Sequence, residues 1–357
     1  MHLDRRFQEL VGIELPILLA PMAGPATAEA AVAVAEAGGL GSLPCALLSE
    51  DRIRADLGVI RQRTRAPINL NFFCHKPARF DAARESGWRQ RLRAYYVELG
   101  LDPAADVPSS DRKAFDAQLC ELVEETRPEV VSFHFGLPEE RLLNRVKATG
   151  AKVQSSATTV AEARWLAEHG CDAVIAQGYE AGGHRGMFLS GDIATQVGTM
   201  ALVPQVVDAV SVPVIAAGGI SDARGIVAAF ALGASAVQIG TAFLRSPEMQ
   251  VSQLHRAALD DQNRNEATAL TNLFTGRPAR GIVNRVMREV GPISESAPEF
   301  PLAGGALAPL RAAAEAKGSA DFTSLWSGQA GPLGAALQAG ELTHKLWAEA
   351  QAIMNAA

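Results

Sequence analysis

The sequence contains the stretch Ala167-Glu-His-Gly170-Cys-Asp-Ala-Val-Ile175, in which a helix-forming run ends at a glycine and a short apolar run follows. Glycine readily adopts the left-handed backbone conformation that closes a helix. A short run of apolar, often β-branched residues is typical of a strand that is buried on both faces. The stretch therefore predicts a helix followed by a strand of a parallel sheet.

The same pattern recurs at three further places in the chain. They are Ala35-Glu-Ala-Gly38-Gly-Leu-Gly-Ser-Leu43, Lys147-Ala-Thr-Gly150-Ala-Lys-Val153 and Ala231-Leu-Gly233-Ala-Ser-Ala-Val-Gln-Ile239. Helix starts agree with this pattern, because Thr159-Val-Ala-Glu162 has the spacing of a capping box. Thr27 and Ser221 each stand just before an Ala-rich periodic run. The pattern indicates strand and helix units in series.

Eight segments are predicted to be strands, and each is separated from the next by a helical stretch. They are Ile17–Ala20, Leu40–Leu43, Ile68–Phe72, Val130–Phe133, Lys152–Ser155, Ala173–Gln177, Val214–Ala217 and Ala236–Gly240. Eight such units predict an α/β fold, a (β/α)8 TIM barrel built from residues 1–73 and 128–246. Residues 74–127 form a charged helical insertion, and residues 247–357 also carry periodic patterns. We expect these two segments to form a smaller, mainly helical cap on the substrate side.

The composition limits the classes of function. A chain of 357 residues with 48% hydrophobic residues can bury a large core. Its 33 Lys and Arg against 39 Asp and Glu give a net charge of −6, which lacks the basic footprint of nucleic-acid binding. An anionic substrate must therefore be attracted by local charges.

Cysteine spacing and hydropathy favour a cytoplasmic protein. The four cysteines have no Cys-x-x-Cys spacing, so neither a zinc site nor a disulfide framework is predicted. Glu14 and Pro16 interrupt the first apolar stretch, which argues against a signal peptide. The uncharged run 225–244 has about the length of a membrane span. Its Ala and Gly content and Gln238 predict a buried helix and strand instead.

Active sites of TIM barrels lie where the strands end, at the carboxyl side. The first predicted strand runs into Met22, the third carries Asn71, the fourth runs into His134 and the sixth ends at Gln177. The last two strands end in glycines, in the runs Ala217-Gly218-Gly219 and Gln238-Ile239-Gly240-Thr241. Bare backbone lets a phosphate approach N–H groups closely. The alternative is that these glycines only serve tight turns.

The segment Gln177-Gly-Tyr-Glu-Ala-Gly-Gly-His-Arg-Gly186 is the most specific local signal. It places His184 among four glycines directly after a strand. Histidine titrates near neutral pH, so it can remove a proton from a weak carbon acid or, when charged, hold an anion. A loop histidine that caps a carbonyl is the alternative. His134 lies among aromatic residues and is a candidate for the substrate site or for a core residue.

Several phrases resemble the ordered motifs of class I nitronate monooxygenases, formerly called 2-nitropropane dioxygenases. They are Pro16-Ile-Leu-Leu-Ala-Pro-Met22, Asn69-Leu-Asn-Phe-Phe73 with Pro77, Val131-Ser-Phe-His-Phe-Gly136, Asp172 to Gly186, Thr271-Asn-Leu-Phe-Thr-Gly-Arg-Pro-Ala-Arg-Gly281 and Leu325-Trp-Ser-Gly-Gln329. The resemblance covers nearly the whole chain.

The resemblance implies an FMN enzyme that oxidises alkyl nitronates, of the propionate 3-nitronate type, with O2 to carbonyl compounds and nitrite. His184 falls at the catalytic histidine of that family, and His134 and His184 are expected to face the substrate. No metal is expected, since no ligand cluster appears at the strand ends. FMN is expected to contact Met22, Asn71, Gln177, Gly182, Gly218, Gly219, Gln238, Ile239, Gly240 and Thr241.

Three questions stay open at this point. An NAD(P)H-dependent FMN reductase, of the flavin enoyl reductase or quinone reductase type, would share the barrel and a similar histidine loop. A barrel that binds a phosphorylated metabolite without turnover is a third reading, because fold does not fix function. The sequence also leaves open whether His184 acts as a base or as a partner for the anion, and what the oligomeric state is.

Overall fold

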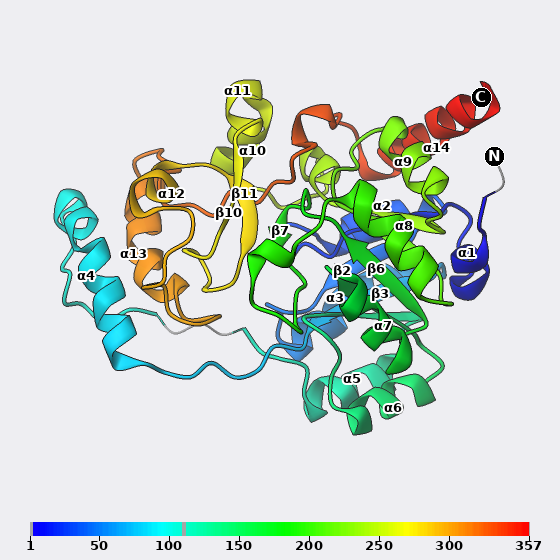
Figure 1. Cartoon of the computed structure of the whole chain (residues 1–357), viewed down its shortest axis with the longest axis horizontal. Coiled ribbons are helices and arrows are strands. Elements are labelled where there is room, and N and C mark those ends of the chain that lie inside the picture. Colours follow the sequence, from blue (N-terminus) through cyan, green and yellow to red (C-terminus); the bar gives the residue numbers. More distant parts are fainter. Residues whose placement is uncertain (1–2, 109–111, 357) are drawn as a thin grey trace.

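Eight parallel strands form a closed barrel in the computed structural model, which describes residues 3–108 and 112–356 (Figure 1). The order around the sheet is β1-β9-β8-β6-β5-β4-β3-β2. Leu18 pairs with Leu40, and this bridge joins the two ends of the sheet. Each strand lies within two residues of its prediction: β1 (Ile17–Leu19), β2 (Gly41–Pro44), β3 (Ile68–Phe73), β4 (Val130–His134), β5 (Lys152–Ala157), β6 (Ala173–Gln177), β8 (Val214–Ala217) and β9 (Ala236–Ile239). The predicted TIM barrel is confirmed.

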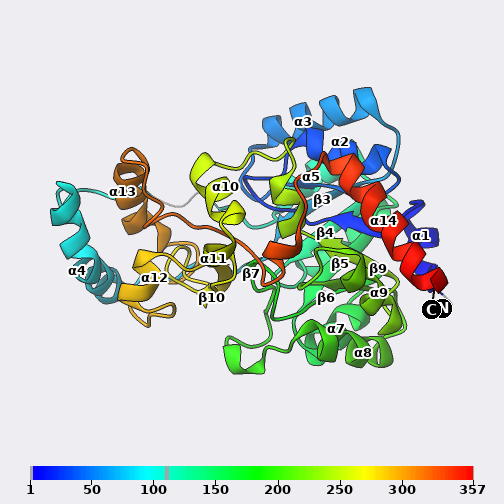
Figure 2. The same cartoon turned by 90° about the horizontal axis from the view of Figure 1, so that it is seen from above.

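Helices surround the barrel and alternate with its strands (Figure 2). They are α2 (Ala28–Glu36), α3 (Glu50–Arg63), α5 (Ala117–Thr126), α6 (Glu140–Ala148), α7 (Val160–Glu168), α8 (Thr199–Ala209) and α9 (Ala223–Ala231). Thr27 and Thr159 cap α2 and α7 as predicted, since each hydroxyl accepts from a backbone amide of the first turn. The start of α9 differs from its prediction, because Asp222 rather than Ser221 accepts the amides of its first turn.

The barrel interior is apolar at its amino-terminal end and polar at its mouth. The short helix α1 (Arg6–Val11) places Phe7 and Val11 against the first residues of several strands, including Val130 and Ala173. Buried polar side chains on the inner face follow further along the strands: Ser42, Asn69, Asn71, Ser132, Gln154 and Ser156. Burying polar groups is costly unless they are hydrogen-bonded, so this polarity indicates that the mouth is the functional end.

A second core lies beside the barrel (Figure 1, left). It joins α4 (Ala82–Leu99), α12 (Arg285–Val290) and α13 (Gly304–Glu315). Trp88 is fully buried there and donates from Nε1 to the carbonyl oxygen of Ala303 at 3.0 Å. The remaining elements of this region are α10 (Gln253–Asp260), α11 (Gln262–Asn265), β10 (Thr268–Thr271), β11 (Ala279–Ile282) and η3 (Gly331–Leu333).

The structure differs from the expected cap in composition. β11 pairs with β10 on one side and with β7 (Gly183–His184) on the other in an antiparallel sheet, so the region beside the barrel is not purely helical. β7 belongs to the loop after β6, which includes η1 (Ile193–Thr195) further on. The pairing of Ala279 with His184 therefore connects the cap directly to the predicted histidine loop.

Two helices within the expected cap segments pack against helices of the barrel. α5 contacts α3 and α6, and α14 (Ala339–Ala356) contacts α2 and α9. The apolar side chains of both helices, such as Leu122 and Leu346, join the barrel core. Residues 117–126 and 339–356 thus pack in the layer of helices around the barrel.

The uncharged run 225–244 falls in α9, β9 and the short helix η2 (Thr241–Arg245). It therefore contains the helix and the strand that the sequence predicts. Across the described ranges, no helix combines the length and hydropathy that a membrane span requires.

Candidate active site

A cavity opens at the carboxyl ends of the strands, where TIM barrels hold their active sites. Both predicted histidines line it, and so do the predicted cofactor residues except one. Those nine are Met22, Asn71, Gln177, Gly182, Gly218, Gly219, Gln238, Gly240 and Thr241. The exception is Ile239, whose side chain is fully buried in the barrel core. Side chains alternate along a strand, so Ile239 points away from the barrel interior that its neighbour Gln238 faces.

The histidine loop is fastened to β6 by a buried arginine. Arg185 is fully buried, and its guanidinium donates to the carbonyl oxygens of Gln177 (2.7 Å) and Gly178 (2.6 Å). Its Nε donates to Oε1 of Gln196 at 2.9 Å. Hydrogen bonds that include a charged group are stronger than neutral ones. Arg185 therefore fixes the start of the loop that carries His184.

Gln177 holds the other side of the same loop. Its Nε2 donates to the carbonyl oxygen of His184 at 3.0 Å, and its Oε1 accepts from the amide of Gly186 at 2.7 Å. Sequence reasoning expected this amide to bond the cofactor. Two hydrogen bonds of the side chain go to the loop, and one N–H of the amide remains for the cofactor. Gln177 therefore acts mainly by positioning the loop.

His134 is held by both of its ring nitrogens. Nε2 lies 3.2 Å from the carbonyl oxygen of His184, and Nδ1 lies 3.1 Å from Oγ of Ser156. A carbonyl oxygen only accepts, so Nε2 carries the proton and Nδ1 accepts from the Ser156 hydroxyl. Burial lowers the pKa of His134 to about 4. His134 is therefore neutral near pH 7 and oriented by the protein.

His184 is surrounded by aromatic rings. Its ring centre lies 5.5 Å from that of Phe300, 5.6 Å from Trp326 and 6.0 Å from Phe135. Burial, and then the nearby charge of Arg112, keep the pKa of His184 well below its ordinary value of 6.5. Because its pKa is lowered, the imidazole of His184 is neutral at pH 7 and is not a cation that could hold an anion by its charge.

Two arginines supply positive charge near this neutral histidine. Arg112 lines the cavity, and its guanidinium lies 5.4 Å from the ring centre of Phe300. The guanidinium of Arg277 lies 4.1 Å from the ring centre of Phe135. Both arginines contribute to the lowered pKa of His184, so both are close enough to act on an anion at the site.

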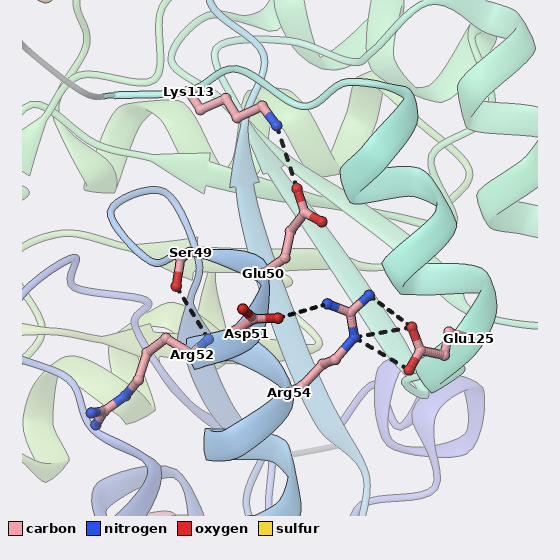
Figure 3. Close-up of polar contacts among 7 residues, drawn as sticks. All are labelled: Ser49, Glu50, Asp51, Arg52, Arg54, Lys113 and Glu125. Carbon is pink, nitrogen blue, oxygen red and sulfur yellow. Dashed lines mark hydrogen bonds and ion pairs between the residues drawn. The ribbon is translucent and has the colours of Figure 1, made fainter.

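The segment that carries Arg112 is tied to the barrel helices by ion pairs (Figure 3). Nζ of Lys113 lies 3.5 Å from Oε1 of Glu50, at the start of α3. Further along α3, Arg54 pairs with Glu125 of α5 at 2.9 Å and with Asp51 at 3.5 Å (Figure 3). Each exposed pair contributes little alone. The Lys113 pair joins the segment before α5 to the start of α3, and the Arg54–Glu125 pair joins α3 to α5.

The ends of β8 and β9 offer backbone donors. Gly218 and Gly219 have φ values of 105° and 71°, a region that other residues adopt only with strain. Among the described residues, no backbone oxygen accepts from the amides of Gly219 or Thr241. Oε1 of Gln238 is buried without a hydrogen-bond partner in the same part of the chain. These groups fit a cofactor with a phosphate and a polar ring.

A family profile described as nitronate monooxygenase matches residues 4–349. The nitronate monooxygenase of Pseudomonas aeruginosa is 42% identical over 96% of this chain and 97% of its own length. That of Paraburkholderia phytofirmans is 40% identical over 96% of this chain and 94% of its own. The chain belongs to the nitronate monooxygenase family. It is an oxidoreductase, and the family expected from the sequence motifs is confirmed.

Solved structures agree with this membership in the nitronate monooxygenase family. The nitroalkane oxidase of Streptomyces ansochromogenes superposes with a TM-score of 0.88, at 36% identity over 98% of this chain and 99% of that one. FabK from Thermotoga maritima superposes with a TM-score of 0.72, at 27% identity over 99% of this chain and 98% of that one. Both comparisons extend over the barrel and the region beside it.

Sequence reasoning did not single out several residues of this nitronate monooxygenase family site. Thr275 contacts His184, and Trp326 and Gly328 line the cavity from the far end of the chain. They lie inside the phrases that carry the family resemblance, so a signal was present for them. Arg112 lies in the charged insertion, where nothing in the local pattern distinguishes it from the other arginines.

Proposed function

We propose that this protein is an FMN-dependent enzyme that oxidises alkyl nitronates, of the propionate 3-nitronate type, with O2 to carbonyl compounds and nitrite. The observation that carries the proposal is one cavity lined by His184, by the cation Arg112 and by Gly219 and Thr241, whose amides bond no backbone oxygen of the described residues. A nitronate is an anion, and a phosphorylated flavin needs N–H donors for its phosphate.

The residues for FMN follow from the free groups in the cavity. The amides of Gly219 and Thr241 would bond the phosphate, and the unpaired Oε1 of Gln238 would accept from the polar edge of the ring. Asn71 uses Nδ2 toward Ser132, which leaves its Oδ1 for the cofactor. Met22 would pack on the apolar part of the ring. When bound, FMN would supply the redox chemistry that oxidation of a nitronate by oxygen requires.

The protein side of the reaction is binding and orientation. Arg112 and Arg277 would attract the nitronate, which an overall charge of −6 does not. Phe73, Phe135, Phe300 and Trp326 surround His184 and would keep water from the reacting carbon. We further propose a cytoplasmic location, since Cys45, Cys74, Cys120 and Cys171 are all unpaired thiols.

The flavin reductase alternative is less well supported. The chain is 36% identical to the solved nitroalkane oxidase and 27% identical to FabK, and its TM-score is higher with the oxidase. Relatives that are 40% to 42% identical carry the name nitronate monooxygenase. These similarities favour oxidation with O2 over reduction with a pyridine nucleotide.

The test is nitrite release and oxygen consumption with propionate 3-nitronate, with and without NADH. We expect a yellow protein whose released cofactor has the mass of FMN and whose turnover does not need NADH. A colourless protein that cannot be reconstituted with FMN would contradict the cofactor. Oxidation of NADH without nitrite release would favour the reductase instead.

A further inference from the structure

The imidazole of His184 has a partner from outside the barrel. Thr275 lies between β10 and β11, and its Oγ1 is 2.9 Å from Nε2 of His184. Thr275 is only 2% exposed, so water does not compete for this contact. The pairing of Ala279 with His184 holds the two segments in register. The contact is therefore a built feature of the interface between cap and barrel.

The hydrogen bonds around Thr275 indicate where its single hydroxyl proton goes. The amide of Arg277 donates to Oγ1 at 3.4 Å, so the hydroxyl oxygen already accepts one bond. The hydroxyl can then donate to Nε2 of His184 at 2.9 Å or to the carbonyl oxygen of Arg277 at 3.4 Å. If Nε2 carried the proton and donated to Oγ1, the buried hydroxyl would keep only the 3.4 Å contact with the carbonyl oxygen of Arg277. That contact is longer than the usual O–H···O range of about 2.5–3.0 Å, so donation to His184 is favoured. Nε2 then accepts, and a neutral imidazole that accepts at Nε2 carries its proton on Nδ1.

Nδ1 of His184 is the nitrogen left for a ligand. His184 lines the cavity, and within residues 3–108 and 112–356 no group bonds its Nδ1. Nδ1 is also not among the buried unsatisfied atoms of the described chain, so it keeps accessible surface. An N–H group at this position faces a ligand as a donor, and it has no lone pair with which to take a proton.

We propose that Thr275 is a positioning residue that fixes His184 in the Nδ1–H form, so that His184 donates a hydrogen bond to an oxygen of the nitronate and does not act as a base. The inference rests on the proposed function for the identity of the ligand. It answers the question that the sequence left open, because a nitronate has already lost the proton that a base would remove.

The first experiment reads the histidine directly. Long-range proton–nitrogen NMR of the 15N-histidine-labelled holoenzyme distinguishes Nδ1–H from Nε2–H, and His184→Asn assigns the signal. We expect Nδ1–H for His184 in the wild type and in Thr275→Ser, which keeps the hydroxyl. An Nε2–H signal in the wild type would overturn the proposal. This readout needs no turnover, so it stands or falls separately from the activity on nitronates.

The second experiment uses kinetics on the same variants. Thr275→Val keeps the shape of the side chain but removes the hydroxyl, and we expect the KM for propionate 3-nitronate to rise about tenfold with a smaller change in kcat. Thr275→Ser should stay within about twofold of the wild type. Unchanged FMN content would show that the site is intact. An unchanged KM in Thr275→Val, with normal flavin content, would overturn the proposal. If Thr275→Val does not fold, the proposal is tested by the NMR spectra of the wild type and of Thr275→Ser.

Discussion

The side chain of Gln177 and the carbonyl oxygen of His184 are joined by a hydrogen bond of 3.0 Å, across a loop that begins at the end of β6. The same carbonyl lies 3.2 Å from Nε2 of His134. The backbone of His184 is thus held from two strands, β6 and β4, while its ring is held from the cap. The barrel sets the position of the histidine, and the cap sets its orientation.

Replacing Gln177 should therefore impair catalysis through the loop. Gln177→Leu removes one buried and one partly buried hydrogen bond and leaves the Gly186 amide unpaired, which costs about 1–3 kcal/mol for that group. We expect kcat/KM to fall at least tenfold and the melting temperature to decrease. Gln205→Leu, on the exposed face of α8, is the matched control and should change neither. Wild-type kinetics in Gln177→Leu would mean that the loop keeps its position without this side chain.

Gly219 allows a test of the phosphate position. Gly219→Asp brings a negative charge and a side chain to a backbone with φ of 71°, next to Glu180. Gly219→Ala is the control for backbone strain alone, which costs about 1–2 kcal/mol. We expect FMN to be lost from the Asp variant and largely kept by the Ala variant, with near-native circular dichroism in both. Full FMN occupancy in Gly219→Asp would place the phosphate elsewhere.

Arg112 should contribute to the binding of anions. Arg112→Met removes a cation from the cavity wall while keeping an apolar stem, and we expect the nitronate KM to rise about tenfold with kcat nearly unchanged. The wild-type KM should rise with ionic strength more than that of the variant. Arg54→Met is the matched control, because it breaks the pair with Glu125 away from the cavity and should leave KM unaltered (Figure 3). Equal effects of the two substitutions would point to a structural role for Arg112.

The barrel was predictable from the sequence because its signals are local. The pattern in Gly170 to Ile175 is a glycine that ends a helix, followed by an apolar run. This pattern depends only on residues that are neighbours in the chain. The glycine-ended strands and the His184 loop were predictable for the same reason. α14 falls in the segment that we expect to form the cap. No local pattern in the sequence indicates that its apolar face packs on α2 and α9. Its partners lie about 100 and 300 residues away in sequence.

The details of the site depend on contacts that the sequence does not encode locally. The bond between Gln177 and the carbonyl of His184 depends on the folded path of the loop. The contact of Thr275 with His184 spans 91 residues, and it depends on the pairing of β7 with β11. The low pKa of His184 depends on burial and on Arg112, which comes from the insertion. Sequence patterns predict which residues line the site, but their protonation states and hydrogen bonds can be inferred only from the fold.

The buried histidines predict a stability that falls in acid. Burial lowers the pKa of His75 and of His134 from 6.5 to about 4. Above pH 6.5 these groups are neutral in the folded and the unfolded chain alike. As the pH falls from 6.5 to about 4, only the unfolded chain takes up their protons, so unfolding becomes more favourable. We expect the melting temperature, measured with excess FMN, to be steady near pH 7 and to drop over this interval. His75→Phe should weaken the drop, and a constant melting temperature down to pH 4 would contradict it.

The last prediction separates the two roles of His184. An asparagine at this position keeps an N–H donor but cannot remove a proton, so His184→Asn tests the base directly. If His184 were a base, this variant would lose turnover of neutral nitroalkanes and keep substantial turnover of pre-formed nitronates. The neutral imidazole and its bond to Thr275 favour the other outcome. We expect the wild type to show little activity on neutral nitroalkanes, and His184→Asn to raise chiefly the nitronate KM. His184→Leu, which lacks any donor, should raise it further. Oxygen consumption on both substrate forms distinguishes the roles. Unchanged kinetics in both variants would show that His184 has only a structural role in the loop.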